Sequence, residues 1–544
     1  MVVSTYPAPT KAEGVTPTEE SPIARIERLG HERPANFTTA WKEIIFVFSI
    51  SMSQLLTDFF VSGFTVILPT LIRDLDIPQA ASVWPATAFS LVIAGTLLVF
   101  SRLGDMYVGS AIFFGGLAWL LLWSVVAGFS VNPIMLDICR ALQGFGPAAA
   151  LPTGVMLMGS IYRPGPRKNL VFAIYGTSAV FGFFGGCVGQ FLRWGFFFSI
   201  GAILTAVTLC TSYILLPQKS VTKSGSTTMD YPGAISIVCG LVLTVFAITQ
   251  SAHAPSSWRT PYIPVCFSLG ILSLCAAFYI ELRIPPQPLL TASMFATPAL
   301  KPLLLALFFL YGAWGVFPVY GTLYFQRIMG ATPLQVVAWF VPLGVAVLFF
   351  SVLKGLILHI VPGRVVLIAS GLGALGSQLL LALIPVGGNY WAWIFPATIL
   401  STIGIDLSTM YMSVFITTAL STSQQGLVGG LMNSVLHLGV VVVLGLTDII
   451  QSATFEEQGL GPSYKNTFWF GVACGAVSLV LMAVWGKLPA AKSDMTADEK
   501  AEIAREARPE TQNPKMIARW GCRVDVYASL PEPDREYIWI CAPS

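Results

Sequence analysis

The chain has 544 residues, of which 55% are hydrophobic and only 10% are charged, and its mean hydropathy is +0.74. Soluble domains carry about 25% charged residues, so this chain lacks the polar side chains that a water-soluble surface needs and is expected to be an integral membrane protein. Its formal net charge of +3 and scattered basic residues exclude a nucleic-acid-binding surface.

Both ends of the chain are polar. Residues 1–41 are rich in Pro, Thr and Glu and contain no short apolar segment with a small-residue cleavage site. The sequence therefore predicts a disordered N-terminal tail without a cleaved signal peptide, so that the first transmembrane helix directs insertion. Residues 488–544 form a second polar tail, in which 497–508 has the charge pattern of a short surface helix.

Fourteen segments between these tails are long and apolar enough to cross a bilayer, which takes about 20 residues in a helix. They cover residues 44–71, 84–101, 109–129, 134–160, 170–191, 195–216, 233–251, 261–280, 302–325, 333–353, 365–386, 391–418, 427–450 and 467–486. An even number of spans places both termini on one side of the membrane.

Basic residues in the short loops predict which side that is. With a cytoplasmic N-terminus, ten basic residues fall in cytoplasmic loops and five in external loops. The ten are Arg102, Arg163, Arg167, Lys168, Lys219, Lys223, Arg283, Lys301, Lys354 and Arg364, and the five are Arg73, Arg193, Arg259, Arg327 and Lys465. We therefore expect both termini in the cytoplasm.

Asp58 is a carboxylate near the middle of the first span. An ionised carboxylate at that depth costs roughly 2.5–3.5 kcal/mol on insertion scales, so it is expected to face protein or water. Gln54, Asp58 and Ser62 are four residues apart, which places them on one face of a helix. This polar stripe predicts that the first span lines a transport pathway rather than simply anchoring the protein in the membrane.

Seven of the nine cysteines fall inside apolar segments, and no CxxC pair occurs. Because cysteine is readily buried as a small apolar residue, we expect core packing, with no metal site and no disulfide framework. No phosphate-binding loop of the G-x-x-x-x-G-K-[ST] type is present. The sequence thus predicts no cofactor, and energy for transport would come from an ion gradient.

The loop after the second span reads SRLGDMYVG at residues 101–109. It resembles the signature G-x-L-a-D-r-x-G-r-k of the major facilitator superfamily, in which the Asp and Arg form a charge relay that latches the two halves together. The resemblance implies a conformational latch made of Arg102, Gly104 and Asp105. Both signature glycines at the ends and the basic pair are replaced here, which implies a weaker latch.

The fourth span begins LDICRALQGFG at residues 136–146, similar to the superfamily motif R-x-x-q-G-x-g. We expect Arg140 about a third of the way in from the outer face, at a depth comparable to Asp58. An Arg facing an Asp across a cavity suits proton coupling, because protonation of the Asp releases the Arg. Alternatively, Asp137 pairs locally with Arg140. Gln54 and Gln143 are predicted to line the substrate cavity.

The fifth span contains a run of glycines at the position of the superfamily's antiporter motif G-P-x-x-G-G. Small residues on one stripe let helices approach closely. We expect Gly182, Gly185, Gly186 and Gly189 to serve helix packing, and the partial match favours antiport.

Residues 84–91, 230–234 and 424–430, together with Trp258, resemble the fourteen-helix drug:proton antiporters, in particular the fungal members typified by the aminotriazole-resistance protein. The resemblance covers residues 41–487. It implies an all-α major facilitator fold with six-helix domains at 42–217 and 301–487, two inserted helices with linkers at 218–300, and tails at 1–41 and 488–544.

The second half has its own ionisable residues within spans. Asp406 and His437 are predicted to form a second proton-coupling pair, since His titrates near physiological pH; the alternative is that His437 is a core residue. Asp448 is expected near the outer interface. Trp314 and Tyr320 are predicted to line an aromatic substrate cavity, unless they face lipid.

These features predict a proton-coupled secondary transporter, not an enzyme, that exports a small organic molecule such as a drug, toxin or secondary metabolite by alternating access. Its expected partners are the lipid bilayer, protons and that substrate, with the chain monomeric and located in the plasma membrane or, alternatively, the vacuolar membrane. Two other functions stay open: a proton-coupled carrier of small ion-like solutes of the ammonium or borate type, and a non-transporting nutrient sensor.

Overall fold

The computed structural model describes residues 32–34, 36–77, 83–163, 166–215, 229–252, 254, 256–283, 300–357, 361–419, 422–485, 523–524 and 539–540. Within these residues, fourteen helical spans are long and apolar enough to cross a membrane, which confirms the predicted number and the all-α class. The helix predicted over 497–508 lies outside the described residues.

Six spans come before the middle pair. They are α2 (Ala40–Asp58) continued by η1 (Phe59–Gly63) and α3 (Phe64–Asp74); α4 (Trp84–Met106); α5 (Gly109–Gly128); α6 (Pro133–Ile161); α7 (Pro166–Ser178) continued by η3 (Ala179–Cys187) and α8 (Val188–Phe191); and α9 (Gly195–Leu215). The first and fifth spans are therefore α-helices interrupted by a π-turn, η1, and by a 3-10 segment, η3.

Eight further spans complete the bundle. They are α10 (Tyr231–Ser251) and α11 (Tyr262–Arg283), joined through η4 (Ser257–Arg259); α12 (Leu300–Arg327); α13 (Pro333–Ile357); α14 (Gly363–Leu383); η6 (Tyr390–Ile394) with α15 (Phe395–Ala419); α16 (Thr422–Gln458); and α17 (Leu460–Trp485). Two short strands, β1 (Arg523–Val524) and β2 (Trp539–Ile540), pair antiparallel.

Local sequence signals set several helix starts. Thr39 and Asn132 cap α2 and α6, where their side-chain oxygens accept from the amides of Lys42 and Met135 at 3.4 and 2.8 Å. Asp230 caps α10 in the same way and is followed by a proline in the first turn. Such residues satisfy amide donors that the helix itself leaves unpaired.

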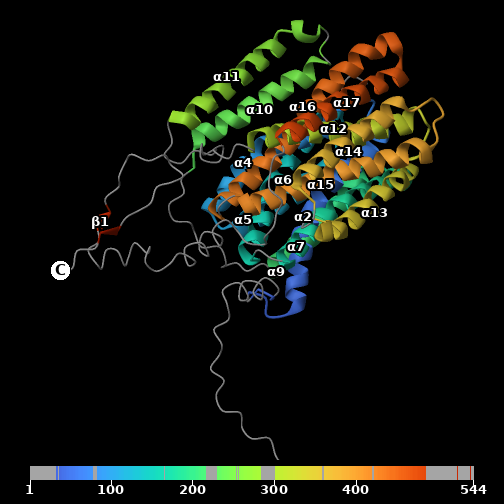
Figure 1. Cartoon of the computed structure of the whole chain (residues 1–544). Helices are drawn as coiled ribbons and strands as arrows, with labels where there is room; N and C mark the ends of the chain where they lie inside the picture. Colours follow the sequence, from blue (N-terminus) through green and yellow to red (C-terminus); the bar gives the residue numbers. More distant parts are fainter. Residues whose placement is uncertain are drawn as a thin grey trace, which may run out of the picture.

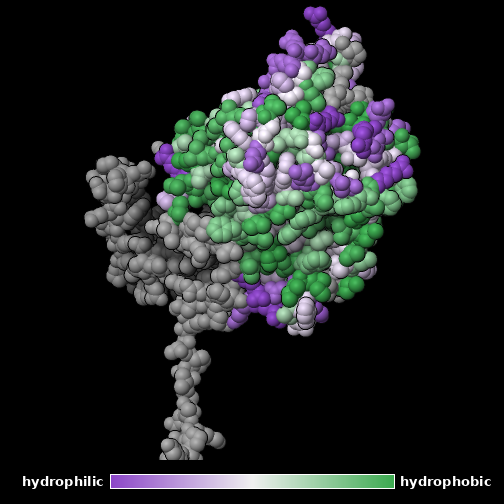
Figure 2. Space-filling view, turned by 90° about the vertical axis from the view of Figure 1, so that its right-hand side faces the viewer, coloured by the Kyte–Doolittle hydropathy of each residue, from purple (hydrophilic) through white to green (hydrophobic). Residues whose placement is uncertain are grey.

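Successive spans alternate in direction, so the bundle has two faces. We call the face at which α2 begins the proximal face; α12 also begins there and α17 ends there. The opposite face, where α3 and α12 end, is the distal face. On the side of the molecule that Figure 2 shows, hydrophobic side chains form a broad band between the proximal and distal faces. Hydrophilic residues gather at the two faces themselves.

The spans pack in two groups, which meet chiefly along α4 and α16. α4 and α5 pack on α6, while α12 and α14 pack on α17, and α4 lies along α16 where the groups meet. α10 and α11 pack mainly against each other at the edge of the bundle, where α10 also touches α4 and α16 (Figure 1). This pair thus lies at the rim of the bundle.

The seven described cysteines fall into three sets, one of which, Cys187 and Cys266, is half-buried. Cys139 and Cys474 are buried, as expected for core packing. Cys210, Cys239 and Cys275 are exposed on helices of the hydrophobic band, so for these three the prediction of core packing is wrong. Hydropathy alone does not separate a core cysteine from a lipid-facing one.

Candidate functional site

The solvent exposure of the first span changes at Asp58. On its proximal part, Ile44 and Phe48 are 54% and 49% exposed and begin a stripe that ends at the half-buried Gln54 and Asp58. Beyond Asp58, nearly every residue from Phe59 to Leu68 is buried. α12 shows the same division: Leu305 on its proximal part is 49% exposed, whereas 315–325 are buried throughout.

Contacts between the two groups of helices bury these distal parts. The Gln326 side chain of α12 donates from Nε2 to the carbonyl oxygen of Val66 on α3 at 2.8 Å. Phe183 of η3 stacks on Phe340 of α13 with ring centroids 4.6 Å apart. We call this set of contacts the distal seal. The conformer is therefore closed toward the distal face, and the exposed stripes of α2 and α12 lie on its proximal side.

Asp58 sits where the exposed stripe meets the sealed part. Gln54, one turn earlier, donates from Nε2 to Oδ2 of Asp58 at 2.7 Å, as their spacing on one helix face predicts. Tyr175 of α7 and Tyr311 of α12 both interact electrostatically with the Asp58 carboxylate. These two tyrosines, one from each group of helices, are therefore within electrostatic range of the carboxylate.

A π-turn directly follows Asp58. In a regular helix the amide of Phe64 would bond to the carbonyl oxygen of Phe60. In η1 the amide of Phe64 instead points to the carbonyl oxygen of Val61. The Phe60 oxygen is thereby available to another donor, and π-turns of this kind occur often at functional sites.

Arg140 supplies that donor. Its side chain is completely buried, and it donates to the carbonyl oxygens of Phe60 at 2.7 Å and Pro85 at 2.9 Å. The guanidinium lies between the rings of Phe64 and Phe89, 4.2 and 4.3 Å from their centroids. Cation–π contacts and charge-assisted hydrogen bonds together compensate for burying the charge.

The predicted Asp58–Arg140 ion pair is not formed among the described residues, because the two side chains lie on different sides of the first span. A helix turns by about 100° per residue, so Phe60 lies about 200° around the axis from Asp58. Phe60 and Phe64 contact Arg140, whereas the Asp58 carboxylate accepts from Gln54 one turn earlier. Arg140 reaches the first span at the depth that the sequence predicted, but its side chain contacts Phe60 and Phe64 rather than Asp58.

The alternative pairing is not formed either. Asp137 and Arg140 interact electrostatically, but the described residues contain no hydrogen bond or ion pair between them. Gln143 instead accepts from Arg140 through Oε1 at 2.8 Å and donates from Nε2 to Ser124 of α5 at 2.7 Å. Gln143 is fully buried in this network, and its place in the substrate cavity stays a prediction.

In the second half, the Asp406 side chain on α15 is buried. Tyr311 of α12 is within electrostatic range of both Asp406 and Asp58. The predicted Asp406–His437 pair is absent, since the structure gives the half-buried His437 no hydrogen bond or ion pair with a described residue. The residue on which both carboxylates act is Tyr311, an uncharged side chain. The positions of charged residues within the spans could not reveal it.

The aromatic residues predicted for the cavity behave differently from one another. Trp314 is half-buried, and its ring centroid is 6.3 Å from that of Tyr311. Tyr320 is buried, packs on Tyr464, and donates its hydroxyl to Oδ1 of Asp448 at 3.3 Å. Tyr320 is thus a core residue, and Asp448, which is 1% exposed, is buried rather than interfacial.

The glycines of the fifth span lie against the first span. A Cβ on Gly182 would meet the backbone of Asp58 and Phe59, with the Phe59 nitrogen only 2.6 Å away. Added Cβ atoms on Gly185, Gly186 and Gly189 would similarly meet Phe59, Val66 and Ile67. Direct backbone contact at Gly182 fixes the position of the π-turn and hence of Asp58.

The latch motif lies at the proximal end of α4. Arg102 is buried, and a Cβ on Gly104 would approach Thr153 of α6 to 3.0 Å. The side chain of Asp105 lies outside the part of the chain that the structure describes. Nearby, α4 and α16 approach closely, since a Cβ on Gly430 would be 2.8 Å from Oγ of Ser101.

Sequence reasoning missed one polar cluster at the proximal face. Glu43, which is 7% exposed, accepts two hydrogen bonds from Arg167 at 2.8 and 2.6 Å and one from the Tyr162 hydroxyl at 3.1 Å. The hydrogen bond to Glu43 raises the pKa of Arg167, and burial raises that of Tyr162, so both remain protonated donors. A Glu in the first turn of a span was the only sequence signal.

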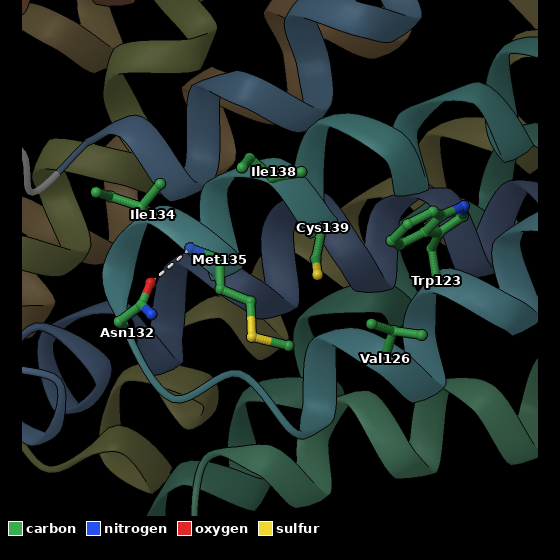
Figure 3. Close-up of a pocket in the computed structure, with 7 residues that line it drawn as sticks. All are labelled: Trp123, Val126, Asn132, Ile134, Met135, Ile138 and Cys139. Atoms are coloured by element: carbon green, nitrogen blue, oxygen red, sulfur yellow. Dashed lines mark hydrogen bonds between the residues drawn. The ribbon is translucent and has the colours of Figure 1, made fainter.

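A shallow apolar pocket of about 370 Å³ lies between the distal ends of α5 and α6. Met135 and Cys139 of α6 lie opposite Trp123 and Val126 of α5, and the capping Asn132 lies at the end of the helix (Figure 3). Ile134 is 72% exposed on the hydrophobic band. This pocket is peripheral and separate from the Asp58 site.

Comparison with known proteins fits this architecture. Residues 50–444 match the model of the Major Facilitator Superfamily. The chain belongs to this superfamily. It is an integral, multi-pass membrane protein and a secondary transporter.

Among curated relatives, the low affinity ammonium transporter of Saccharomyces cerevisiae is 30% identical, covering 77% of this chain and 83% of that protein. The efflux pump terJ of Aspergillus terreus is 30% identical, with 84% and 89% covered. The aminotriazole resistance protein of Saccharomyces cerevisiae is 25% identical, with 84% and 86% covered.

Solved structures share the fold. A peptide transporter of the POT family in complex with sulfate matches with a TM-score of 0.59 at 15% identity, covering 82% of this chain and 95% of that chain. The human organic anion transporter TETRAN matches with a TM-score of 0.53 at 14% identity, with 80% and 99% covered.

Proposed function

We propose that this protein is a proton-coupled exporter of a small organic molecule, with Asp58 as the proton-binding residue. The observation that carries the proposal is the position of Asp58 at the inner end of the exposed stripe of α2. Its one hydrogen bond within the described residues comes from the neutral Gln54. A carboxylate held in this way can exchange a proton, whereas one locked to Arg140 could not do so without breaking an ion pair.

The site suits alternating access. Asp58 lies at the boundary between the open and sealed parts of the first span, within electrostatic range of Tyr311 from the other group of helices. Protonation removes a charge from that region, so it changes the relative free energies of the two conformers. Asp406, which also acts electrostatically on Tyr311, would add to the response, and the proximal face would be cytoplasmic.

Relatives support export. Two of the proteins described above are named as an efflux pump and as a resistance protein, and both align over 84% of this chain. The fourteen spans and the 2.8 Å distal hydrogen bond between Gln326 and Val66 fit a transporter captured with its distal side closed. Release would follow once this seal opens.

The test compares wild type with Asp58→Asn in yeast lacking its own efflux pumps and in proteoliposomes. Aminotriazole resistance and proton movement coupled to substrate are the readouts, with Asp76→Asn as the control. Asp76 is an exposed carboxylate at the distal face with a φ of 52°, a conformation that Asn also adopts. We expect Asp58→Asn to abolish proton-driven transport and Asp76→Asn to leave it unchanged. Full resistance from well-expressed, membrane-located Asp58→Asn contradicts the proposal.

A second candidate is a carrier of ammonium-like cations. The 30% identity to the low affinity ammonium transporter favours it, as do the two carboxylates within spans, Asp58 and Asp406, which could attract a cation. Uptake of radiolabelled methylammonium by proteoliposomes distinguishes the two functions. Saturable methylammonium transport without aminotriazole transport would favour the carrier.

A further inference from the structure

Asp137 is a carboxylate within the fourth span that the proposed function leaves unused. Its Oδ1 atom is buried and has no hydrogen-bond partner among the described residues. The flanking Ile134 and Ile138 are 72% and 54% exposed, so Asp137 stands between two exposed apolar residues near the distal start of α6. A carboxylate in this setting is costly unless a partner satisfies it in some state of the protein.

Arg140 is the basic group within reach of Asp137. The two residues are three apart on α6, which makes them neighbours on the helix surface. The Cα–Cβ bond of a helical residue tilts toward the helix N-terminus, so the Arg140 side chain starts out in the direction of Asp137. The two groups already interact electrostatically.

In the distal-closed conformer, however, Arg140 is directed elsewhere. It donates to Phe60, Pro85 and Gln143, and the Phe60 acceptor lies within the π-turn. If η1 returned to regular α-helix, the amide of Phe64 would reclaim the Phe60 oxygen. Arg140 would lose one of its three acceptors and need a replacement.

We propose that Asp137 is the alternate partner of Arg140, which leaves the Phe60 carbonyl and pairs with Asp137 when the distal seal opens. Asp137 is then a positioning residue that stabilises the distal-open conformer. This inference rests on the alternating access of the proposed function. It gives the π-turn a role: η1 holds Arg140 in the closed conformer, and Asp137 holds it in the open one.

Hydrogen–deuterium exchange of the full chain in nanodiscs tests the inference. Peptides from α3 and from the distal half of α12 report opening of the distal seal, and peptides from α14 serve as an internal reference. We compare wild type with Asp137→Asn, Asp137→Glu and the control Asp76→Asn. Without a carboxylate at 137 the open conformer loses a partner for Arg140, so exchange in α3 and α12 should slow by about threefold or more.

Asp137→Glu keeps the charge and should exchange like wild type, as should Asp76→Asn. Exchange in α3 and α12 that is the same in Asp137→Asn and wild type would overturn the inference. If exchange in the reference helix α14 became faster in Asp137→Asn, the substitution would have destabilised the protein generally. The inference would then fail if Asp137→Glu also differed from wild type.

The experiment separates this inference from the proposed function. It needs no substrate and no proton gradient, so it reads only the balance between conformers. If Asp137→Asn exchanges like wild type while Asp58→Asn abolishes proton-coupled transport, the proposed change of partner of Arg140 is rejected and the proposed function stands. An Asp137 effect in a protein whose Asp58→Asn variant transports normally rejects the role of Asp58 alone.

Discussion

Arg140 shows how a charged side chain can lie inside a membrane protein without an ion pair. Two carbonyl oxygens, one amide oxygen and two aromatic rings surround its guanidinium, and the carboxylates of Asp58 and Asp137 are not bonded to it. Arg has a planar group with several donors in fixed directions, so it can serve all of these partners at once. Lys cannot.

Arg140→Lys should therefore destabilise the protein although it keeps the charge. Each hydrogen bond to a charged group contributes about 1.5–3 kcal/mol, and the ammonium group would lose at least one of three, so we expect a loss of about 2–4 kcal/mol. Thermal unfolding in detergent, followed by tryptophan fluorescence, measures the change. Arg73→Lys, at an exposed arginine beside Asp74, is the matched control and should leave the Tm unchanged. Equal Tm values for Arg140→Lys and wild type would contradict the role of the guanidinium geometry.

Sequence reasoning located the key residues but not their partners. Asp58, Arg140 and Gln54 stood out because polar groups are rare in spans, and the Gln54–Asp58 contact followed from a four-residue spacing. The direction in which Arg140 points depends on the π-turn and on backbone oxygens of Phe60 and Pro85. Backbone acceptors are present at every residue, so the sequence gives no sign of which ones a side chain will choose.

At the scale of elements, the first and fifth spans shape each other. The π-turn of η1 lies against the 3-10 segment η3, and glycines of η3 permit backbone contact there. The sequence predicted close packing from the glycine stripe and fourteen spans from hydropathy, since both depend on residue type alone. The π-turn and the 3-10 segment are changes in backbone hydrogen bonding, which residue type alone does not specify, so the glycine run did not reveal them.

Gly182→Ala tests this contact. The new methyl group would lie within 2.7 Å of three backbone atoms of Asp58 and Phe59, so the helices must separate. Overpacking of this kind costs typically about 1–3 kcal/mol, and displacement of Asp58 should reduce transport at least tenfold. Gly176→Ala on the same span is the control, because its Cβ would meet nothing within 4 Å. Ala has a higher helix propensity than Gly, so Gly176→Ala should keep its stability and activity. A Gly182→Ala protein with wild-type Tm and transport would refute the argument.

At the scale of the whole molecule, two groups of helices meet along α4 and α16 and at the distal seal. The inserted α10 and α11 touch this arrangement at its rim, on α4 and α16. Gln326 is the side chain that hydrogen-bonds across the seal, to Val66. Breaking that bond should raise the free energy of the closed conformer without affecting either group by itself.

Gln326→Ala should therefore shift the protein toward the distal-open conformer. A typical intramolecular hydrogen bond contributes about 0.5–1.5 kcal/mol, which corresponds to roughly a two- to tenfold change in population. Faster hydrogen–deuterium exchange in α3 and in the distal half of α12 would report the shift. Asn466→Ala is the control, because Asn466 bonds to Gln458 within the distal hairpin of α16 and α17. A seal that exchanges equally slowly in Gln326→Ala and wild type would show that the aromatic contacts alone hold it closed.

The closed distal seal also has a pharmacological consequence. The proximal parts of α2 and α12 carry exposed apolar side chains, Phe48 and Leu305 among them, while their distal parts touch. A rigid compound wedged between these stripes would hold the proximal side apart and so keep the distal side shut. Blockade by such a compound would be one-sided: a membrane-impermeant inhibitor would act from the compartment at the proximal face and be inert in the other.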